Sequence, residues 1–211
     1  MIHELRIYTL KAGSVAEVAK NSGTVGRGIR GDNYGKLEGY WTTEIGPLNQ
    51  VVHLWSYKDL NERARLRVEL SKNERWTNEY LPLIRPFLLR QDIRLLNPIL
   101  DLKAPSGGKN VYELRYYRTQ PGAARAWIGH FKEALPVREK YSKIVGLWNT
   151  EAGQPNEVMH LWAFPDLNAR ATARDAAAKD PDWQAFVKKA GGMLDELANL
   201  VMLPSAHSPL Q

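Results

Sequence analysis

The hydrophobic pattern predicts a first strand at the very start of the chain. Leu5 and Ile7 are apolar and alternate with Glu4, Arg6 and Tyr8. A period of two is typical of a β-strand whose two faces differ. We expect the apolar face to pack against helices, which would leave the other three side chains facing the interior of the fold.

The next 90 residues predict a helix, two strands, a second helix and a last strand. Residues 14–17 read Ser-Val-Ala-Glu, the spacing of a capping box at the start of a helix. Glycines follow at 23, 26, 28 and 31. Each costs about 1 kcal/mol in a helix interior, so we expect this helix to be short or interrupted near Gly23. Strands are predicted over 37–44 and 51–57, a helix from Asp59, and a strand over 93–96.

The chain then repeats this order. Residues 39–67 align without a gap on residues 146–174, and sixteen of the 29 aligned residues are identical. The two first strands align at an offset of 109 instead of 107, so the second copy is two residues shorter, and we expect the difference to lie in its first helix. We therefore predict one repeat over residues 1–102, a Pro- and Gly-rich linker over 103–109, and a second repeat over 110–211.

The element order of each repeat predicts the fold class. A β-α-β-β-α-β unit of this length is the ferredoxin-like pattern, in which helices cover one face of the sheet. The other face of each sheet needs a cover, and a second copy of the same unit supplies it. We expect an α+β protein whose two ferredoxin-like repeats pack sheet to sheet as a pseudo-dimeric barrel.

The repeated block resembles a known family. The segment GYWTTEIGPLNQVVHLWSYKDLNERARLR, its echo in the second repeat and the opening HELRIYTLKAG are similar to the signature of the NIPSNAP family. The resemblance covers nearly the whole chain. It implies a dimeric α+β barrel, here made within one chain. Proteins that share only this barrel include cofactor-free monooxygenases, isomerases and haem-binding peroxidases, whereas the family itself implies no settled activity.

The alternation of the strands predicts a candidate site inside the barrel, between the two sheets. If the apolar residues face the helices, then acids, arginines, imidazoles and indoles from both repeats line the interior, which is the composition of a small-molecule site. The predicted ligand-binding side chains are Glu4, Arg6, Tyr8, Trp41, Trp55, Glu113, Arg115, Tyr117, Trp148 and Trp162. His53 and His160 are the candidate catalytic residues, because a histidine beside an arginine can remove a proton and hold the resulting anion.

Three functions remain open at this stage. The first is binding of a small aromatic or amphipathic ligand between the sheets. The second is a cofactor-free monooxygenase or isomerase with a histidine base, and the third is a non-enzymatic oligomeric scaffold whose barrel is filled by Glu–Arg pairs. No cofactor is predicted, with haem as an alternative. No metal site is predicted, because His53 and His160 have no neighbouring ligand at zinc-binding spacing.

Composition narrows the remaining classes. The chain has no cysteine, which excludes disulfides and thiolate chemistry. Its net charge is +6, but basic and acidic residues alternate along the predicted helices, so we expect no nucleic-acid partner. No apolar stretch approaches the length of a membrane span and no leader precedes the first strand. We expect a cytoplasmic protein that forms a homo-oligomer.

Overall fold

The first repeat of the computed structural model, which describes residues 1–211, has the predicted order of elements. Its strands are β1 (Ile2–Leu10), β2 (Lys36–Ile45), β3 (Gln50–Tyr57) and β4 (Leu88–Leu100). Its helices are α1 (Val15–Asn21), α2 (Arg27–Arg30), α3 (Leu60–Ser71) and α4 (Leu81–Ile84), with π-helical turns at Ser22–Gly26 and Trp76–Tyr80 and a 3₁₀ turn at Arg85–Phe87.

The second repeat has the same order with longer, regular helices. Its strands are β5 (Val111–Thr119), β6 (Ile144–Ala152), β7 (Glu157–Phe164) and β8 (Leu194–Pro204). Its helices are α5 (Ala124–Arg138), α6 (Leu167–Lys179) and α7 (Pro181–Ala190), followed by a 3₁₀ turn at Gly191–Met193. Strand β4 is longer than the predicted 93–96, because β1 of the same repeat pairs with it from Leu88 and β6 of the other repeat pairs with it up to Leu100.

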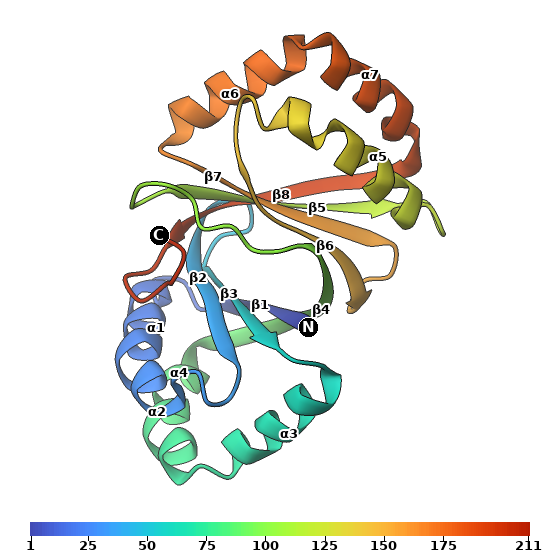
Figure 1. Ribbon diagram of the computed structural model, residues 1–211. Helices are drawn as coiled ribbons and strands as arrows, with labels where there is room; N and C mark the ends of the chain where they lie inside the picture. Colours follow the sequence, from blue (N-terminus) through green and yellow to red (C-terminus); the bar gives the residue numbers. More distant parts are fainter.

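The eight strands close into one barrel in the order β1-β3-β2-β8-β5-β7-β6-β4. Within each repeat the strands pair antiparallel, and the two halves join where β2 pairs with β8 and β4 pairs with β6. The helices of the first repeat cover one side of the barrel and those of the second cover the opposite side (Figure 1). The predicted fold class, two ferredoxin-like repeats closed sheet to sheet, is therefore confirmed.

The first helix of repeat one is interrupted, as its glycines predicted. A π-helical turn begins at Ser22, directly after α1, whereas α5 in repeat two is one continuous helix. Two glycines of this turn allow close packing: a Cβ at Gly26 would lie 2.8 Å from the ring of Tyr80, and one at Gly23 would lie 2.5 Å from the ring of His207. The interruption therefore seats two aromatic rings against the helix backbone.

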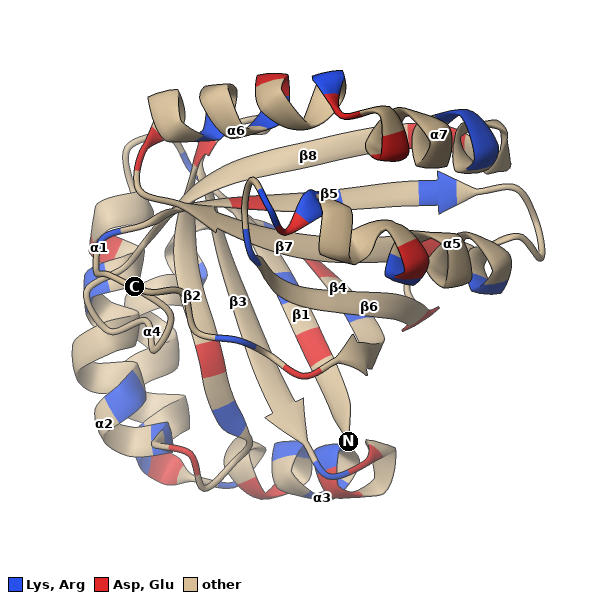
Figure 2. Ribbon diagram, turned by 45° about the horizontal axis from the view of Figure 1, so that its top comes forward, with Lys and Arg blue, Asp and Glu red and all other residues tan.

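The outer helices carry both signs of charge, and aspartates cap α3 and α6, whereas the predicted capping box of α1 does not form because Ser14 Oγ donates to Lys11 O instead. Lys, Arg, Asp and Glu are interspersed along α3 and α6 (Figure 2). The side chain of Asp59 accepts a hydrogen bond from the backbone N–H of Glu62, and Asp166 accepts one from Ala169 in the same way. None of the helices is long and apolar enough to cross a membrane.

Candidate functional site

The two faces of β1 lie opposite to their predicted placement. Leu5 and Ile7 belong to a core cluster that contains residues of both repeats and fills the barrel. Arg6 and Tyr8 instead line a cavity under the helices of repeat one. The prediction that Glu4, Arg6 and Tyr8 face the barrel interior is therefore wrong. Both faces of the strand are buried, so alternation distinguishes two faces without saying which one meets the helices.

The same inversion holds for the other predicted side chains. His53 and Trp55 line the cavity of repeat one. In repeat two the residues that face α5, α6 and α7 instead of the barrel interior are Glu113, Arg115, Tyr117, His160 and Trp162. The physical reason is charge: each buried carboxylate needs more cationic partners than the one arginine on its own strand, and α3 and α6 supply them.

Trp41 and Trp148 do lie inside the barrel, apart from the other candidates. Both are fully buried in the core shared by the two repeats, and Trp148 donates a hydrogen bond from Nε1 to His3 Nδ1 at 2.9 Å. A cavity beside them has a volume of about 10 Å³ and is lined only by hydrophobic residues. This space is about the minimum for one water molecule and far too small for an aromatic ligand, so the structure does not support the predicted pocket between the two sheets.

Each repeat has a cavity on the outer side of its sheet, between strands and helices. Cavity one, in repeat one, has a volume of about 400 Å³, and cavity two, in repeat two, has about 350 Å³. Both volumes are in the range of small-molecule sites. The predicted side chains of β1 and β3, and of β5 and β7, are cross-strand neighbours, with Arg6 opposite His53 and Arg115 opposite His160.

A buried carboxylate organises three arginines in each repeat. Glu4 pairs with Arg6 Nε at 3.1 Å, accepts a hydrogen bond from Arg63 and lies 3.8 Å from Arg67 Nη1. In repeat two, Glu113 accepts hydrogen bonds from Arg115 at 2.7 Å and Arg170 at 2.6 Å, and lies 3.8 Å from Arg174. Each cluster holds one negative and three positive groups, so it leaves an excess of positive charge beside each cavity.

A histidine and a tryptophan two residues apart form a fixed pair in each repeat. Trp55 Nε1 donates to His53 Nδ1 at 2.6 Å, and Trp162 Nε1 donates to His160 Nδ1 at 2.6 Å. A nitrogen that accepts a hydrogen bond carries no proton, so each neutral imidazole has its proton on Nε2. Nε2 of His160 is buried and has no hydrogen-bond partner. The nitrogen that is not bonded to tryptophan, Nε2, is therefore a hydrogen-bond donor in both imidazoles.

Both histidines are neutral over the physiological range. Burial lowers the pKa of His53 well below its usual value, and Arg6 and Arg30 lower it further. Burial likewise lowers the pKa of His160, assisted by Arg115, Arg138 and Arg174. A weakly basic imidazole whose free nitrogen already carries the proton is poorly suited to remove one. The geometry thus disfavours the predicted role of His53 and His160 as general bases.

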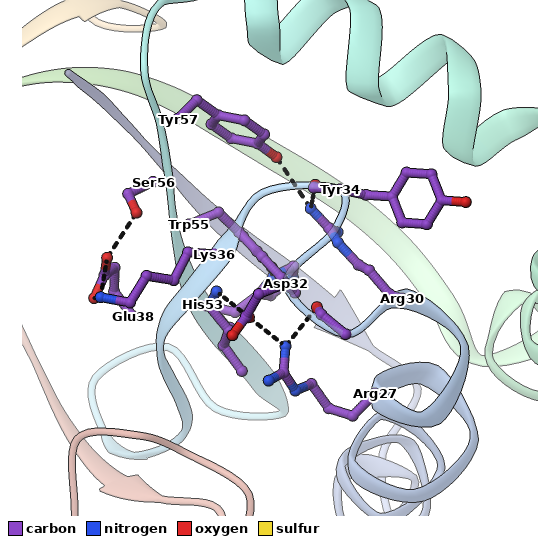
Figure 3. A network of polar contacts seen from close by, with 12 residues as sticks. Arg27, Arg30, Asp32, Tyr34, Lys36, Glu38, His53, Trp55, Ser56 and Tyr57 are labelled. Atoms are coloured by element: carbon purple, nitrogen blue, oxygen red, sulfur yellow. Dashed lines mark hydrogen bonds and ion pairs between the residues drawn. The ribbon is translucent and has the colours of Figure 1, made fainter.

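Sequence reasoning missed an arginine that stacks on the paired tryptophan. The guanidinium carbon of Arg30 lies 3.4 Å from the centre of the Trp55 ring, and that of Arg138 lies 4.8 Å from Trp162. Arg30 is 4% exposed, donates to Tyr34 O and Tyr57 Oη, and leaves its Nε without a partner (Figure 3). The two arginines are 108 residues apart, whereas the repeated blocks align at offsets of 109 and 107. Neither alignment therefore places Arg30 opposite Arg138.

Cavity one also contains a hydrogen-bonded cluster of three hydroxyl groups that has no counterpart in cavity two. Ser22 Oγ lies 2.9 Å from Tyr80 Oη and accepts a hydrogen bond from Tyr40 Oη at 3.0 Å. Ser22 opens one π-helical turn and Tyr80 closes the other. Burial raises the pKa of Tyr80 to about 12, so its phenol stays protonated. π-helical turns are rare and frequent at functional sites.

The C-terminal tail of repeat two reaches cavity one. His207 lines it and packs on Tyr40, with ring centroids 4.4 Å apart. Ser208 Oγ accepts from the backbone N–H of Tyr40 at 3.0 Å, which fixes the tail beside β2. Figure 1 shows the tail next to α1. Burial and Arg27 lower the pKa of His207 to about 4, so this imidazole is also neutral.

No group of three His, Asp or Glu side chains has the arrangement of a metal site. The side chains that line cavity one supply guanidinium, phenol, hydroxyl, indole and neutral imidazole groups.

Comparisons with known proteins agree with the fold. The family model described as NIPSNAP matches residues 3–102 and again residues 112–209. Protein NipSnap homolog 3A of Homo sapiens is 31% identical over 216 residues, which cover 100% of this chain and 86% of the relative. Protein NipSnap homolog 1 of Danio rerio is 30% identical and covers 100% of this chain and 77% of the relative. The solved structure of an anthrone oxidase-like protein superposes with a TM-score of 0.70 over 96% of this chain and 90% of its own, at 8% identity, so it shares the fold alone. With two family matches and relatives aligned along its whole length, the chain belongs to the NIPSNAP family.

Proposed function

We propose that the protein binds a small organic anion with an aromatic or otherwise apolar body, and that cavity one holds it. The observation that carries this proposal is the charge of the lining. Five arginines line the cavity, and no aspartate or glutamate does. The ligand's negative group would lie near Arg6, Arg30 and His53, and its apolar body against the hydrophobic half of the wall.

The charge balance of the arginines supports an anion. Arg6 and Arg67 share one carboxylate, Glu4, and Arg27 pairs with Asp32 at 2.8 Å. Arg30 and Arg85 have no carboxylate partner. A concave site with uncompensated cations and low-dielectric walls attracts an anion more strongly than a flat surface does.

The donors in the cavity support the same ligand. His53 has its proton on Nε2, and Arg30 has a buried Nε without a partner. A buried donor that lacks an acceptor costs about 1–3 kcal/mol. A carboxylate or enolate oxygen offers the acceptors that these groups lack. The hydroxyl groups of Ser22, Tyr40 and Tyr80 add a second polar end, suited to a carbonyl or hydroxyl group of the ligand.

Proton abstraction by a histidine is the weaker alternative. His53 presents N–H where a base would present a lone pair, and His207, with a pKa of about 4, is a weak base at pH 7. The scaffold alternative predicted a barrel filled by Glu–Arg pairs, whereas apolar residues fill it and the Glu–Arg pairs lie outside it. That alternative gives no role to the two cavities outside it, so we favour binding.

The test uses 2-naphthoate as a probe and compares matched variants. Arg6→Gln removes a cation from cavity one and leaves Glu4 with Arg63 and Arg67, whereas Arg115→Gln makes the same change in cavity two. Loss of a charge-assisted hydrogen bond is worth about 1.5–3 kcal/mol. We expect calorimetric titration to show roughly tenfold or greater weakening for Arg6→Gln. Arg115→Gln should leave the affinity within twofold. Equal effects of both variants, or no binding by the wild type at millimolar probe, would refute the proposal.

A further inference from the structure

Most of the strand residues that line cavity two, its floor, match those of cavity one, but several of the helix residues that form its wall differ. At the offset of 109 that aligns β1 with β5, Val18 and Ser22 of repeat one correspond to Trp127 and Phe131 of repeat two. The rings of Trp127 and Phe131 stack at 5.0 Å between centroids, with 15° between their planes. An aromatic wall therefore replaces the side of cavity one that carries a hydroxyl group.

The opposite wall has changed as well. At the offset of 107 that aligns α3 with α6, Leu70 corresponds to Ala177, and both residues line their cavities. The smaller alanine leaves room that leucine fills in repeat one. Trp183 of α7 corresponds to Trp76 of cavity one at the same offset, but Phe186 replaces Glu79 and adds a ring whose centroid lies 4.8 Å from that of Trp183. Cavity two thus suits a flat ring more than a polar chain.

Cavity two has fewer polar groups than cavity one, and its three arginines share their lining with a carboxylate. Glu113 lines this cavity itself and holds Arg115 and Arg174, whereas no carboxylate lines cavity one. Tyr117 accepts a hydrogen bond from Arg115, so its hydroxyl is engaged. Arg138 donates to Ser142 Oγ at 2.6 Å and stacks on Trp162.

One polar group in this cavity has no hydrogen-bond partner. His160 is 3% exposed, and its Nε2 has no hydrogen-bond partner although Nδ1 accepts from Trp162. The hydrogen bond at Nδ1 places the proton on Nε2, so the imidazole is a fixed donor among aromatic rings. An unsatisfied buried donor is costly, and a single acceptor oxygen satisfies it.

We infer that cavity two is a second binding site with its own specificity: it takes a neutral, planar aromatic or conjugated molecule with one carbonyl oxygen. The carbonyl accepts the hydrogen bond from His160 Nε2, and the ring packs against Phe131 and Trp183. This site is independent of the anion proposed for cavity one, because the two cavities lie on opposite sides of the barrel and share no lining residue.

The experiment uses two probes with the same ring, the neutral ketone 2-acetylnaphthalene and the anion 2-naphthoate. The seven indole N–H signals, assigned by single Trp→Phe variants, report the site by ¹H–¹⁵N NMR. Trp162 and Trp183 line cavity two, and Trp55 and Trp76 line cavity one. We expect the ketone to shift the first pair and naphthoate to shift the second. A ketone that shifts only Trp55 and Trp76, or no indole at all, overturns the inference.

A matched variant tests the room that the ring needs. Ala177→Leu introduces the side chain that repeat one already holds at the aligned position, so we expect the affinity for the ketone to fall at least tenfold and that for naphthoate to change less than twofold. An unchanged affinity for the ketone overturns the inference. If this variant does not fold, competition decides: saturating naphthoate must leave the wild-type affinity for the ketone within twofold, and displacement of the ketone overturns the inference.

Discussion

Replacing the buried carboxylate of repeat two by an amide, Glu113→Gln, tests the electrostatic account of the sheet–helix layer. Glu113 is 1% exposed and accepts hydrogen bonds from Arg115, Arg170 and Asn199 at 2.7, 2.6 and 3.0 Å. Glutamine keeps the shape but removes the negative charge and directs two N–H groups at cations. Removing one partner of a buried ion pair costs about 3–5 kcal/mol.

The exposure of the partners sets the value within that range. The side chains of Arg115, Arg170 and Arg174 are 16%, 22% and 40% exposed, so water solvates the cations in part after the carboxylate is lost. We therefore expect the lower end, a decrease of about 3 kcal/mol in the free energy of unfolding. Urea denaturation at pH 7, followed by circular dichroism, measures it.

The control is the same substitution in an exposed pair. Glu196→Gln removes a carboxylate that pairs with Arg118 at 2.5 Å, but the two side chains are 64% and 41% exposed. Exposed ion pairs contribute about 0–1 kcal/mol. If Glu113→Gln costs less than about 1 kcal/mol, or no more than Glu196→Gln, then the buried cluster is not what stabilises this layer. If Glu113→Gln does not fold, Asn199→Ala removes one of the three hydrogen bonds and should cost about 1.5–3 kcal/mol.

The dependence on pH gives a separate check on Glu113. Burial alone would raise its pKa, but the hydrogen bond from Arg170 and the charges of Arg115, Arg170 and Arg174 outweigh burial and hold the pKa below its usual value. A carboxyl group with a depressed pKa stabilises the fold above its unfolded-state pKa and loses this contribution as the pH falls below about 4.5. The wild type should therefore lose stability below this pH more steeply than Glu113→Gln.

Three further predictions concern other parts of the molecule. Burial lowers the pKa of His3 to about 4 from 6.5, so unfolding takes up a proton below about pH 6.5 and the free energy of unfolding falls on acidification. His3 alone should account for a decrease of about 2 kcal/mol between pH 7 and pH 5. Equal urea midpoints at the two pH values would contradict this. Gly23→Ala places a methyl group 2.5 Å from the ring of His207, so amide exchange in residues 205–211 should accelerate roughly tenfold by mass spectrometry, whereas unchanged protection would show that the ring moves without the tail. Asp166→Ala removes the cap of α6 and should lower the free energy of unfolding by about 1 kcal/mol, measured by urea denaturation, and a change below about 0.3 kcal/mol would contradict the capping role.

The internal repeat made the fold predictable from the sequence. The prediction of which face of β1 meets the helices failed because both faces are buried. Two aligned copies of one ferredoxin-like pattern leave few ways to cover two sheets, so closure into a barrel follows from the sequence. The alternation of Glu4, Leu5 and Arg6 correctly grouped the polar side chains on one face. It could not orient that face, because the closed barrel buries both sides of β1. The deciding contacts come from Arg63 and Arg67 of α3, which are distant in sequence and carry no strand period.

The parts of the candidate site that sequence reasoning missed lie on irregular helices. Ser22 and Tyr80 belong to π-helical turns, and the turn at Ser22 shifts the following residues relative to an α-helical period. Arg30 therefore has no partner at either repeat offset, although it occupies the same position over Trp55 as Arg138 does over Trp162. His207 lies in a tail whose contacts with Tyr40 cross from one repeat to the other. Neither feature has a local pattern in the sequence.

Cavity-lining residues that are the same in both repeats serve the architecture, and those that differ bear on ligand specificity. Side chains on the strands recur in both copies, as in the pair of Arg6 and Arg115 and the pair of His53 and His160. Recurrence there has a structural reason, since each sheet must bury the same carboxylate with the same arginines against its helices.

Several cavity-lining side chains on the helices differ between the copies, and the difference bears on ligand chemistry. Ser22 against Phe131 and Leu70 against Ala177 change the wall of each cavity without touching the shared floor. The barrel core constrains neither position, because both lie outside it. Two copies joined in one chain can therefore keep one architecture and diverge in what they bind, because closure of the barrel depends on the strands and specificity depends on the helices.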